Sequence, residues 1–121
     1  MSSAPFKAKA YLKEGCPFSF KFLVFALEAG LLDRVEIRRM REDAPDFEAT
    51  KQRLSEGLGK AATFPTVEVA PGLYMSDSDR IIDYFAERHG LDPDEMPVLS
   101  FYKETIYPQV VELHAIKTGK A

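Results

Sequence analysis

The sequence predicts an α/β domain in which a four-stranded mixed sheet carries helices on both faces. Three features of the element order point to it: an opening of strand, helix and strand, a second helix, and then two short strands followed by a third helix. The opening implies a parallel pair of strands joined by a right-handed crossover. The later strands form a hairpin and add antiparallel strands to the same sheet. A chain of 121 residues is long enough for one such domain with its own core.

The elements of the first half are bounded by turn residues. Residues 7–12 form a short strand that ends in a Glu-Gly turn. Residues 17–29 begin with a proline in the first helical turn and end before Gly30. Apolar side chains surround nearly the whole of this helix, so we expect it between the sheet and other helices. Residues 35–40 carry many charges, which suits a strand at a sheet edge.

Turn and cap residues also bound the elements of the second half. A helix is predicted over residues 46–58, with an aspartate as its N-cap and a glycine after its end. Residues 66–69 alternate as a strand, and after an Ala-Pro-Gly turn residues 73–75 pair back on them. A last helix, capped by Ser76 or Asp77, runs to about residue 89 and ends before a glycine. The order is therefore β-α-β-α-β-β-α.

Composition limits the class of protein. The net charge is −3 with acidic and basic residues interspersed, which argues against a nucleic-acid partner. A single cysteine cannot form an internal disulfide, so we expect a reducing compartment and a cytoplasmic protein. The first five residues lack the pattern of a signal peptide. The longest apolar run, residues 18–32, is interrupted by polar residues and too short to span a bilayer. We expect no membrane partner and no metal site.

Cys16 is the candidate reactive group. It follows a strand and stands at the head of a helix, where unpaired backbone N–H groups converge and favour a thiolate. The polar turn before it predicts a thiol near the surface, although a small buried core cysteine is the alternative. The Ser19 hydroxyl and the nearby Lys13 are predicted to add to the stabilisation of the sulfur anion.

Two further loops are predicted to meet the head of that helix. Phe64 and Pro65 open the third strand, and a cis bond between them would direct the main-chain N–H and C=O of Phe64 at a bound peptide. Residues 75–79 combine the N–H groups of a helix start with a hydroxyl and carboxylates. That mixture can hold the zwitterionic end of an α-amino acid, and helix capping alone is the alternative. Lys13 could meet a second carboxylate of the same ligand.

With these loops the chain resembles the glutaredoxins and, more closely, the thioredoxin-fold N-terminal domain of glutathione S-transferases. Residues 13–19, K-E-G-C-P-F-S, are similar to the glutaredoxin lysine-x-x-Cys-Pro-aromatic-Cys/Ser site and to Gly-Cys-Pro-Phe-Ser of plant dehydroascorbate reductases and chloride intracellular channel proteins. Thr-Phe-Pro at 63–65 resembles the family's Thr-Val-Pro, and residues 77–85 resemble the transferase Glu-Ser-x-Ala-Ile-x-x-Tyr-Leu motif. The resemblance implies a thioredoxin-like glutathione-binding domain over residues 1–90. A linker and a C-terminal helical extension would occupy residues 91–121.

The resemblance also implies a glutathione site. Cys16 would form the mixed disulfide, and Phe64 would pair main chain to main chain with the tripeptide. Asp77 and Ser78 would hold the γ-glutamyl end, and Lys13 the glycine carboxylate. Asp77 stands where a glutamate is commoner and is one methylene shorter. The binding residues implied in this way are Lys13, Pro17, Phe18, Phe64, Pro65, Asp77 and Ser78.

We therefore predict a glutathione-dependent thiol–disulfide oxidoreductase with Cys16 and Ser19 in its catalytic site and glutathione as cosubstrate. Ser19 replaces the second cysteine of dithiol glutaredoxins, which leaves a monothiol route to a small or protein disulfide. The alternatives are a glutathione transferase or dehydroascorbate reductase completed by a dimer partner, a non-catalytic glutathione-binding module, and a dimer holding an iron–sulfur cluster. Apolar residues between 96 and 116 need burial against this domain or, in a homodimer, against a second copy. Pro108 is predicted to kink or divide any helix there.

Overall fold

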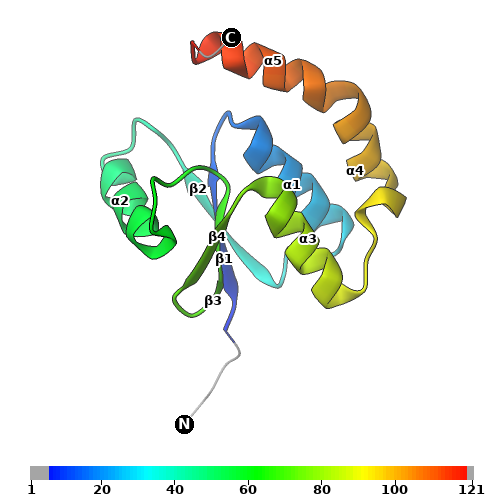
Figure 1. Cartoon of the computed structure of the whole chain (residues 1–121), viewed down its shortest axis with the longest axis horizontal. Helices are drawn as coiled ribbons and strands as arrows, with labels where there is room; N and C mark the ends of the chain where they lie inside the picture. The colour runs from blue at the N-terminus through cyan, green and yellow to red at the C-terminus, as the bar shows by residue number, and fades with distance from the viewer. Residues whose placement is uncertain (1–5, 120–121) are drawn as a thin grey trace.

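A single mixed sheet forms the centre of the protein, seen here in a computed structural model that describes residues 6–119. Its strands are β1 (Ala8–Lys13), β2 (Val35–Met40), β3 (Thr66–Ala70) and β4 (Leu73–Ser76). They lie in the order β2-β1-β3-β4, with β1 parallel to β2 and antiparallel to β3, and β4 antiparallel to β3. Helices α1 (Pro17–Glu28) and α3 (Ser78–His89) cover one face, and α2 (Phe47–Leu58) covers the other (Figure 1). The predicted fold class is confirmed.

The alternation of side chains along β1 divides the core between the two faces. Ala10 and Leu12 belong to the larger cluster, beneath α1 and α3, whereas Tyr11 belongs to a smaller cluster with Phe47 and Leu54 beneath α2. Successive side chains of a strand point to opposite faces, so the apolar residues of this central strand serve both clusters. Because β1 lies between β2 and β3, its carboxyl end delivers the next loop to the middle of the sheet.

Helix α1 differs from the prediction of an all-round buried helix. Phe22 and Phe25 are buried, but Phe20 is 50% exposed and Leu27 is 64% exposed. Lys21, which interrupts the apolar run, is buried instead. Helix α1 lies between the sheet and the C-terminal helices, as predicted, with β1, α3, α4 and α5 as its main neighbours. These neighbours do not enclose it: the Phe20 ring packs against Tyr102, at a centroid distance of 5.2 Å, yet stays half exposed, and Leu27 is exposed. The expectation of burial on all sides was wrong for these two residues.

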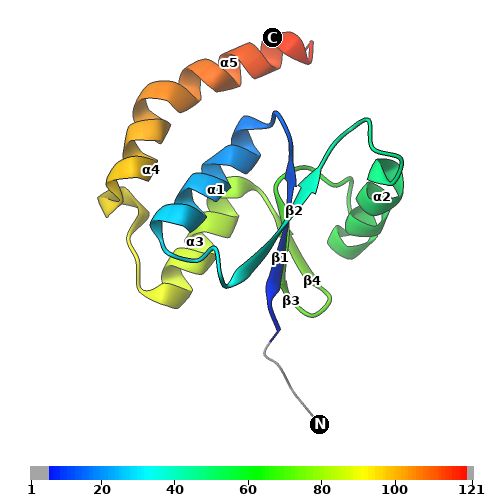
Figure 2. The same cartoon turned by 180° about the vertical axis from the view of Figure 1, so that it is seen from behind.

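The C-terminal segment is helical and folds back along α1. It consists of a 3₁₀ turn (Pro93–Glu95), α4 (Pro97–Phe101), a π-helical turn η2 (Tyr102–Ile106) and α5 (Tyr107–Lys117). Pro108 was predicted to kink or divide a helix, and the helical segment is irregular there: the π turn ends directly before α5, in which Pro108 is the second residue. Figure 2 shows α4 beside α1, and α5 above the N-terminal end of α1.

One carboxylate fastens this segment to the domain. Glu28, the last residue of α1, accepts the N–H groups of Val98 and Leu99, each at 2.8 Å. These are orphan donors of the first turn of α4, so the side chain of one helix caps another. The division of the chain near residue 90 stays a prediction.

Apolar side chains on the outer side of the segment have no cover within the described chain. Phe101 and Leu113 are both 65% exposed, Ile116 is 58% exposed and Ile106 is 46% exposed. Burial against this domain, which was one of two expectations, reaches residues such as Leu99 but not these four. A homodimer through this surface therefore stays a proposal. None of the helices within residues 6–119 has the length and apolar character needed to cross a membrane.

Candidate functional site

The Cys16 sulfur lies at the point where β1 turns into α1. Cys16 is the N-cap residue of α1, in an extended backbone conformation, and its Sγ accepts the backbone N–H of Ser19 at 3.4 Å. A sulfur in this position receives an orphan donor of the first helical turn, which stabilises negative charge on it. The Ser19 hydroxyl was expected to contact the sulfur, but its Oγ accepts the N–H of Lys13 instead, at 3.1 Å.

The thiol is less exposed than its polar turn predicted. Cys16 is only 8% exposed, and its S–H donates to the main-chain oxygen of Phe64 at 3.6 Å. The loop before β3 thus covers the sulfur, which local sequence before the cysteine cannot indicate. The Phe64–Pro65 peptide bond is cis, as expected. Phe64 and Cys16 are therefore brought together as predicted, although 48 positions separate them in the sequence.

A polar cavity of about 410 Å³ opens beside Phe64. It joins the two loops that the sequence singled out, since the turn before β3 and the start of α3 both line it. Asp77 caps α3 by accepting the N–H of Asp79 at 3.0 Å, and does so with a φ of 78° that aspartate tolerates better than most residues. The lining residues are Phe18, Lys21, Lys60, Thr63, Phe64, Ser76, Asp77, Ser78, Asp79 and Tyr107.

A second cavity of about 360 Å³ reaches Cys16 itself and shares no lining residue with the first. Lys13 lies here, not with Asp77 and Ser78, and its Nζ pairs with Glu42 at 3.3 Å. Most of the other side chains that line it are apolar. The complete lining is Leu12, Lys13, Glu14, Gly15, Cys16, Ser19, Phe20, Leu23, Ile37 and Arg39. Within residues 6–119 no three His, Cys, Asp or Glu side chains are grouped so as to hold a metal ion.

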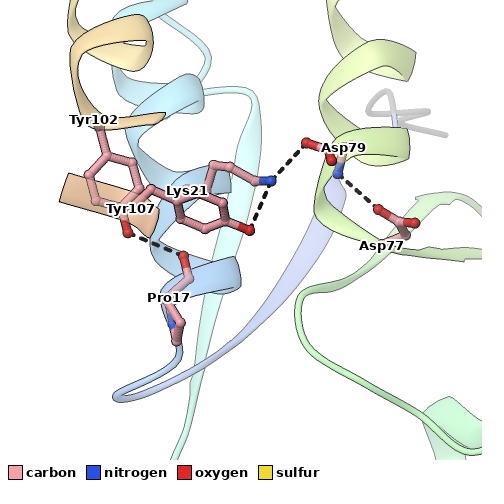
Figure 3. A network of polar contacts seen from close by, with 6 residues as sticks. All are labelled: Pro17, Lys21, Asp77, Asp79, Tyr102 and Tyr107. Atoms are coloured by element: carbon pink, nitrogen blue, oxygen red, sulfur yellow. Dashed lines mark hydrogen bonds and ion pairs between the residues drawn. The ribbon is translucent and has the colours of Figure 1, made fainter. Parts of the chain in front are cut away.

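Lys21 is a candidate site residue that the sequence did not indicate. It is 3% exposed, lines the polar cavity, and donates to Asp79 Oδ1 at 2.7 Å and to the Tyr107 hydroxyl at 3.2 Å (Figure 3). Burial acts to lower the lysine pKa, but the hydrogen bonds to Asp79 and Tyr107 outweigh it and hold the pKa of Lys21 above its ordinary value. The ammonium therefore stays charged. The only feature of the sequence that could have indicated this role is a lysine in the middle of an apolar helix.

Two tyrosines connect the C-terminal segment to the first turn of α1. The hydroxyl of Tyr102 donates to the main-chain oxygen of Pro17 at 3.4 Å (Figure 3). The ring of Tyr107 meets the edge of Phe18, with ring centroids 6.1 Å apart. Burial raises the pKa of the Tyr102 phenol, so it remains a hydrogen-bond donor. The ring of His114, also in α5, packs on Phe18, with ring centroids 6.0 Å apart.

Three solved structures of a similar fold are described as a glutathione transferase, a possible one and a member of the glutathione transferase family. A glutathione transferase family member from Pseudomonas fluorescens Pf-5, crystallised with bound glutathione, is 25% identical with a TM-score of 0.53 over 69% of this chain and 38% of that one. A possible glutathione S-transferase from Rhodopseudomonas palustris is 20% identical with a TM-score of 0.54, over 90% of this chain and 57% of that one. Glutathione transferase Omega 2C from Trametes versicolor is 18% identical with a TM-score of 0.54, over 97% of this chain and 55% of that one.

This chain thus spans between 38% and 57% of the length of these three proteins. No curated protein sequence matches it. The likenesses show a thioredoxin-like domain of the transferase type, with a helical segment after it. The family model described as "Glutathione S-transferase, N-terminal domain" matches residues 15–88, which include the Cys16 turn, the cis proline and the start of α3. The chain therefore belongs to the glutathione S-transferase N-terminal domain family.

Proposed function

We propose that this protein is a glutathione-dependent thiol–disulfide oxidoreductase that acts through Cys16 by a monothiol mechanism. The observation that carries the proposal is the position of the sulfur. It receives the Ser19 N–H at 3.4 Å and lies 3.6 Å from the carbonyl oxygen of Phe64, a residue that also lines the polar cavity. The glutathione bound to the Pseudomonas fluorescens relative supports this choice of cosubstrate.

The polar cavity fits the γ-glutamyl end of glutathione. The α-carboxylate of the ligand would lie at the backbone N–H and hydroxyl of Ser78, at the start of α3, and its ammonium at Asp77. Phe64 would pair with the cysteinyl main chain, which directs the ligand's sulfur toward Cys16. Lys13 would meet the glycine carboxylate by exchanging its exposed partner Glu42, a pair that costs little to break.

Each turnover consumes one glutathione and forms one oxidised glutathione. The Cys16 thiolate attacks the glutathionyl sulfur of a mixed disulfide, so that a Cys16–glutathione bond forms, the substrate S–S bond breaks, and the substrate thiolate leaves and takes a proton from water. The thiolate of a second glutathione then attacks the glutathionyl sulfur on Cys16. Oxidised glutathione leaves and the Cys16 thiolate is restored. Ser19 offers no second thiol, so an internal disulfide plays no part.

The apolar cavity favours a second candidate function. Leu12, Phe20 and Leu23 line it together with Cys16, which gives an apolar compound access to the sulfur. Conjugation of glutathione to an apolar electrophile, or reduction of dehydroascorbate, with the pocket completed by a dimer partner, is therefore the runner-up. Turnover of a chlorinated nitroaromatic electrophile in the absence of disulfide turnover would favour it.

Mass spectrometry tests the proposal directly. Incubation with oxidised glutathione should add one glutathionyl group to the peptide that contains Cys16, and reduced glutathione should remove it. Turnover of a glutathione–cysteine mixed disulfide, followed through NADPH and glutathione reductase, should be lost in Cys16→Ser with the fold intact. Full turnover in that variant, or a protein that reacts with iodoacetamide but forms no adduct, would refute the mechanism.

A further inference from the structure

The Lys21 ammonium has no role in the reaction proposed above, although it lines the polar cavity. A lysine ammonium has three N–H donors. Asp79 and the Tyr107 hydroxyl take two of them, at 2.7 and 3.2 Å, and the third meets no acceptor among residues 6–119. Burying a charge is costly unless it is paired and hydrogen-bonded. Asp79 is 67% exposed and gives only part of that compensation.

The Tyr107 hydroxyl offers a second donor in the same place. It accepts from Lys21, and its own O–H has no acceptor among the described residues. Its ring lies under the ammonium, with Nζ 4.4 Å from the ring centroid, so the two groups are held as one unit (Figure 3). Two donors on adjacent atoms match the two oxygens of a carboxylate.

The charges that line the cavity point to the kind of carboxylate. Lys21 and Asp79 neutralise each other, which leaves Asp77 as an anion and Lys60 as a cation on the same lining. A ligand that brings an ammonium to Asp77 and a carboxylate to Lys21 is an α-amino acid end. A simple anion would leave the Asp77 carboxylate without a contact to the ligand, and a simple amine would leave the spare donors of Lys21 and Tyr107 unused.

We propose that Lys21 and Tyr107 bind the α-carboxylate of the ligand's γ-glutamyl end and make the site specific for ligands with a free α-amino acid group. This inference rests on the proposed glutathione function. It also makes the C-terminal segment part of the binding site, because Tyr107 belongs to α5. The contact between Tyr102 and Pro17 fixes that segment on the helix that bears Cys16 and Lys21.

Binding of three S-methylated ligands, which form no disulfide, tests the assignment. They are S-methylglutathione, the 4-aminobutyryl analogue that lacks only the α-carboxylate, and the analogue with an amidated glycine. Calorimetry should show that the wild-type protein binds the 4-aminobutyryl analogue about tenfold to a hundredfold more weakly than S-methylglutathione. Lys21→Met should lose a similar factor for S-methylglutathione and for the amidated analogue, and nothing further for the 4-aminobutyryl analogue.

Two further variants complete the design. Tyr107→Phe keeps the ring and removes the hydroxyl, so it should weaken S-methylglutathione about threefold to tenfold and leave the 4-aminobutyryl analogue unchanged. Lys7→Met makes the same change of net charge at an exposed residue that lines neither cavity, and should change nothing. If Lys21→Met does not fold, Tyr107→Phe carries the test.

The outcomes separate the two proposals. Equal losses for S-methylglutathione and the 4-aminobutyryl analogue in the variants, or no loss at all, would show that Lys21 and Tyr107 do not meet the carboxylate and would overturn the assignment alone. A wild-type protein that binds none of the three ligands would overturn the glutathione function and the assignment with it.

Discussion

Glu28 offers a quantitative test of how firmly the C-terminal segment is attached. Its carboxylate accepts two N–H groups at 2.8 Å, and neither the Val98 N–H nor the Leu99 N–H has another acceptor among residues 6–119. A hydrogen bond to a charged group contributes about 1.5–3 kcal/mol where water is excluded. The Val98 bond is exposed and the Leu99 bond is partly buried, so water replaces much of each. We expect Glu28→Ala to cost about 1–2 kcal/mol in total, the range of a lost helix N-cap.

Hydrogen exchange locates this loss. The Val98 and Leu99 amides should exchange about fivefold to thirtyfold faster in Glu28→Ala, the factor that corresponds to 1–2 kcal/mol. Glu28→Gln keeps one acceptor oxygen and should give an intermediate value. Glu87→Ala removes an exposed carboxylate from α3 and should stay within about 0.5 kcal/mol of wild type in urea unfolding. Unchanged exchange at both amides in Glu28→Ala would refute the cap, whatever the global stability of the variant.

Three other predictions follow from the packing and charges. Gly57→Ala should cost about 1–3 kcal/mol in urea unfolding, because a Cβ there would lie 2.4 Å from the ring of Tyr74; an unchanged midpoint would contradict this. Hydrogen bonds raise the pKa of Lys21 in the folded state, so Lys21 stabilises the fold fully below the unfolded lysine pKa of about 10.4 and loses that contribution as the pH rises through the folded pKa. The free energy of unfolding should therefore fall more steeply above about pH 10 in the wild type than in Lys21→Met. If the outer surface of the C-terminal segment pairs two copies, light scattering should give twice the chain mass, and Leu113→Glu with Ile116→Glu should return the monomer; a monomeric wild type would end that proposal.

The element boundaries could be predicted because local chemistry marks them. Pro17 stands in the first turn of α1, where its missing N–H costs nothing. Gly59 and Gly90 end α2 and α3 with φ values of 74° and 65°, in the region that glycine enters most easily. The sheet order then follows from a parallel opening and a hairpin, so topology alone brings Phe64 to the turn that contains Cys16.

The other half of the polar cavity could not be predicted. Lys21 meets Asp79 and Tyr107 across 58 and 86 positions of sequence, distances over which no helical or strand period extends. A lone lysine in an apolar helix usually indicates a solvent-facing side, and only the placement of α3 and α5 over that side buries it. The same limit applies to Asp46, which takes the N-cap position of α2 without making a side-chain capping bond.

The burial of the thiol bears on the kind of disulfide that can react. Cys16 is only 8% exposed, so its sulfur can be attacked, or can attack, only along a line that enters through the cavity beside it. Attack on a disulfide also needs the attacking sulfur and the two disulfide sulfurs to lie close to one line. A disulfide on the surface of a folded protein cannot reach this arrangement with a sulfur at the bottom of a cavity. Because the Phe64 carbonyl covers another side of the sulfur at 3.6 Å, we expect small mixed disulfides to react much faster than folded glutathionylated proteins. Equal rates for a small glutathione mixed disulfide and for a glutathionylated folded protein would mean that the β1–α1 turn opens before the thiol reacts.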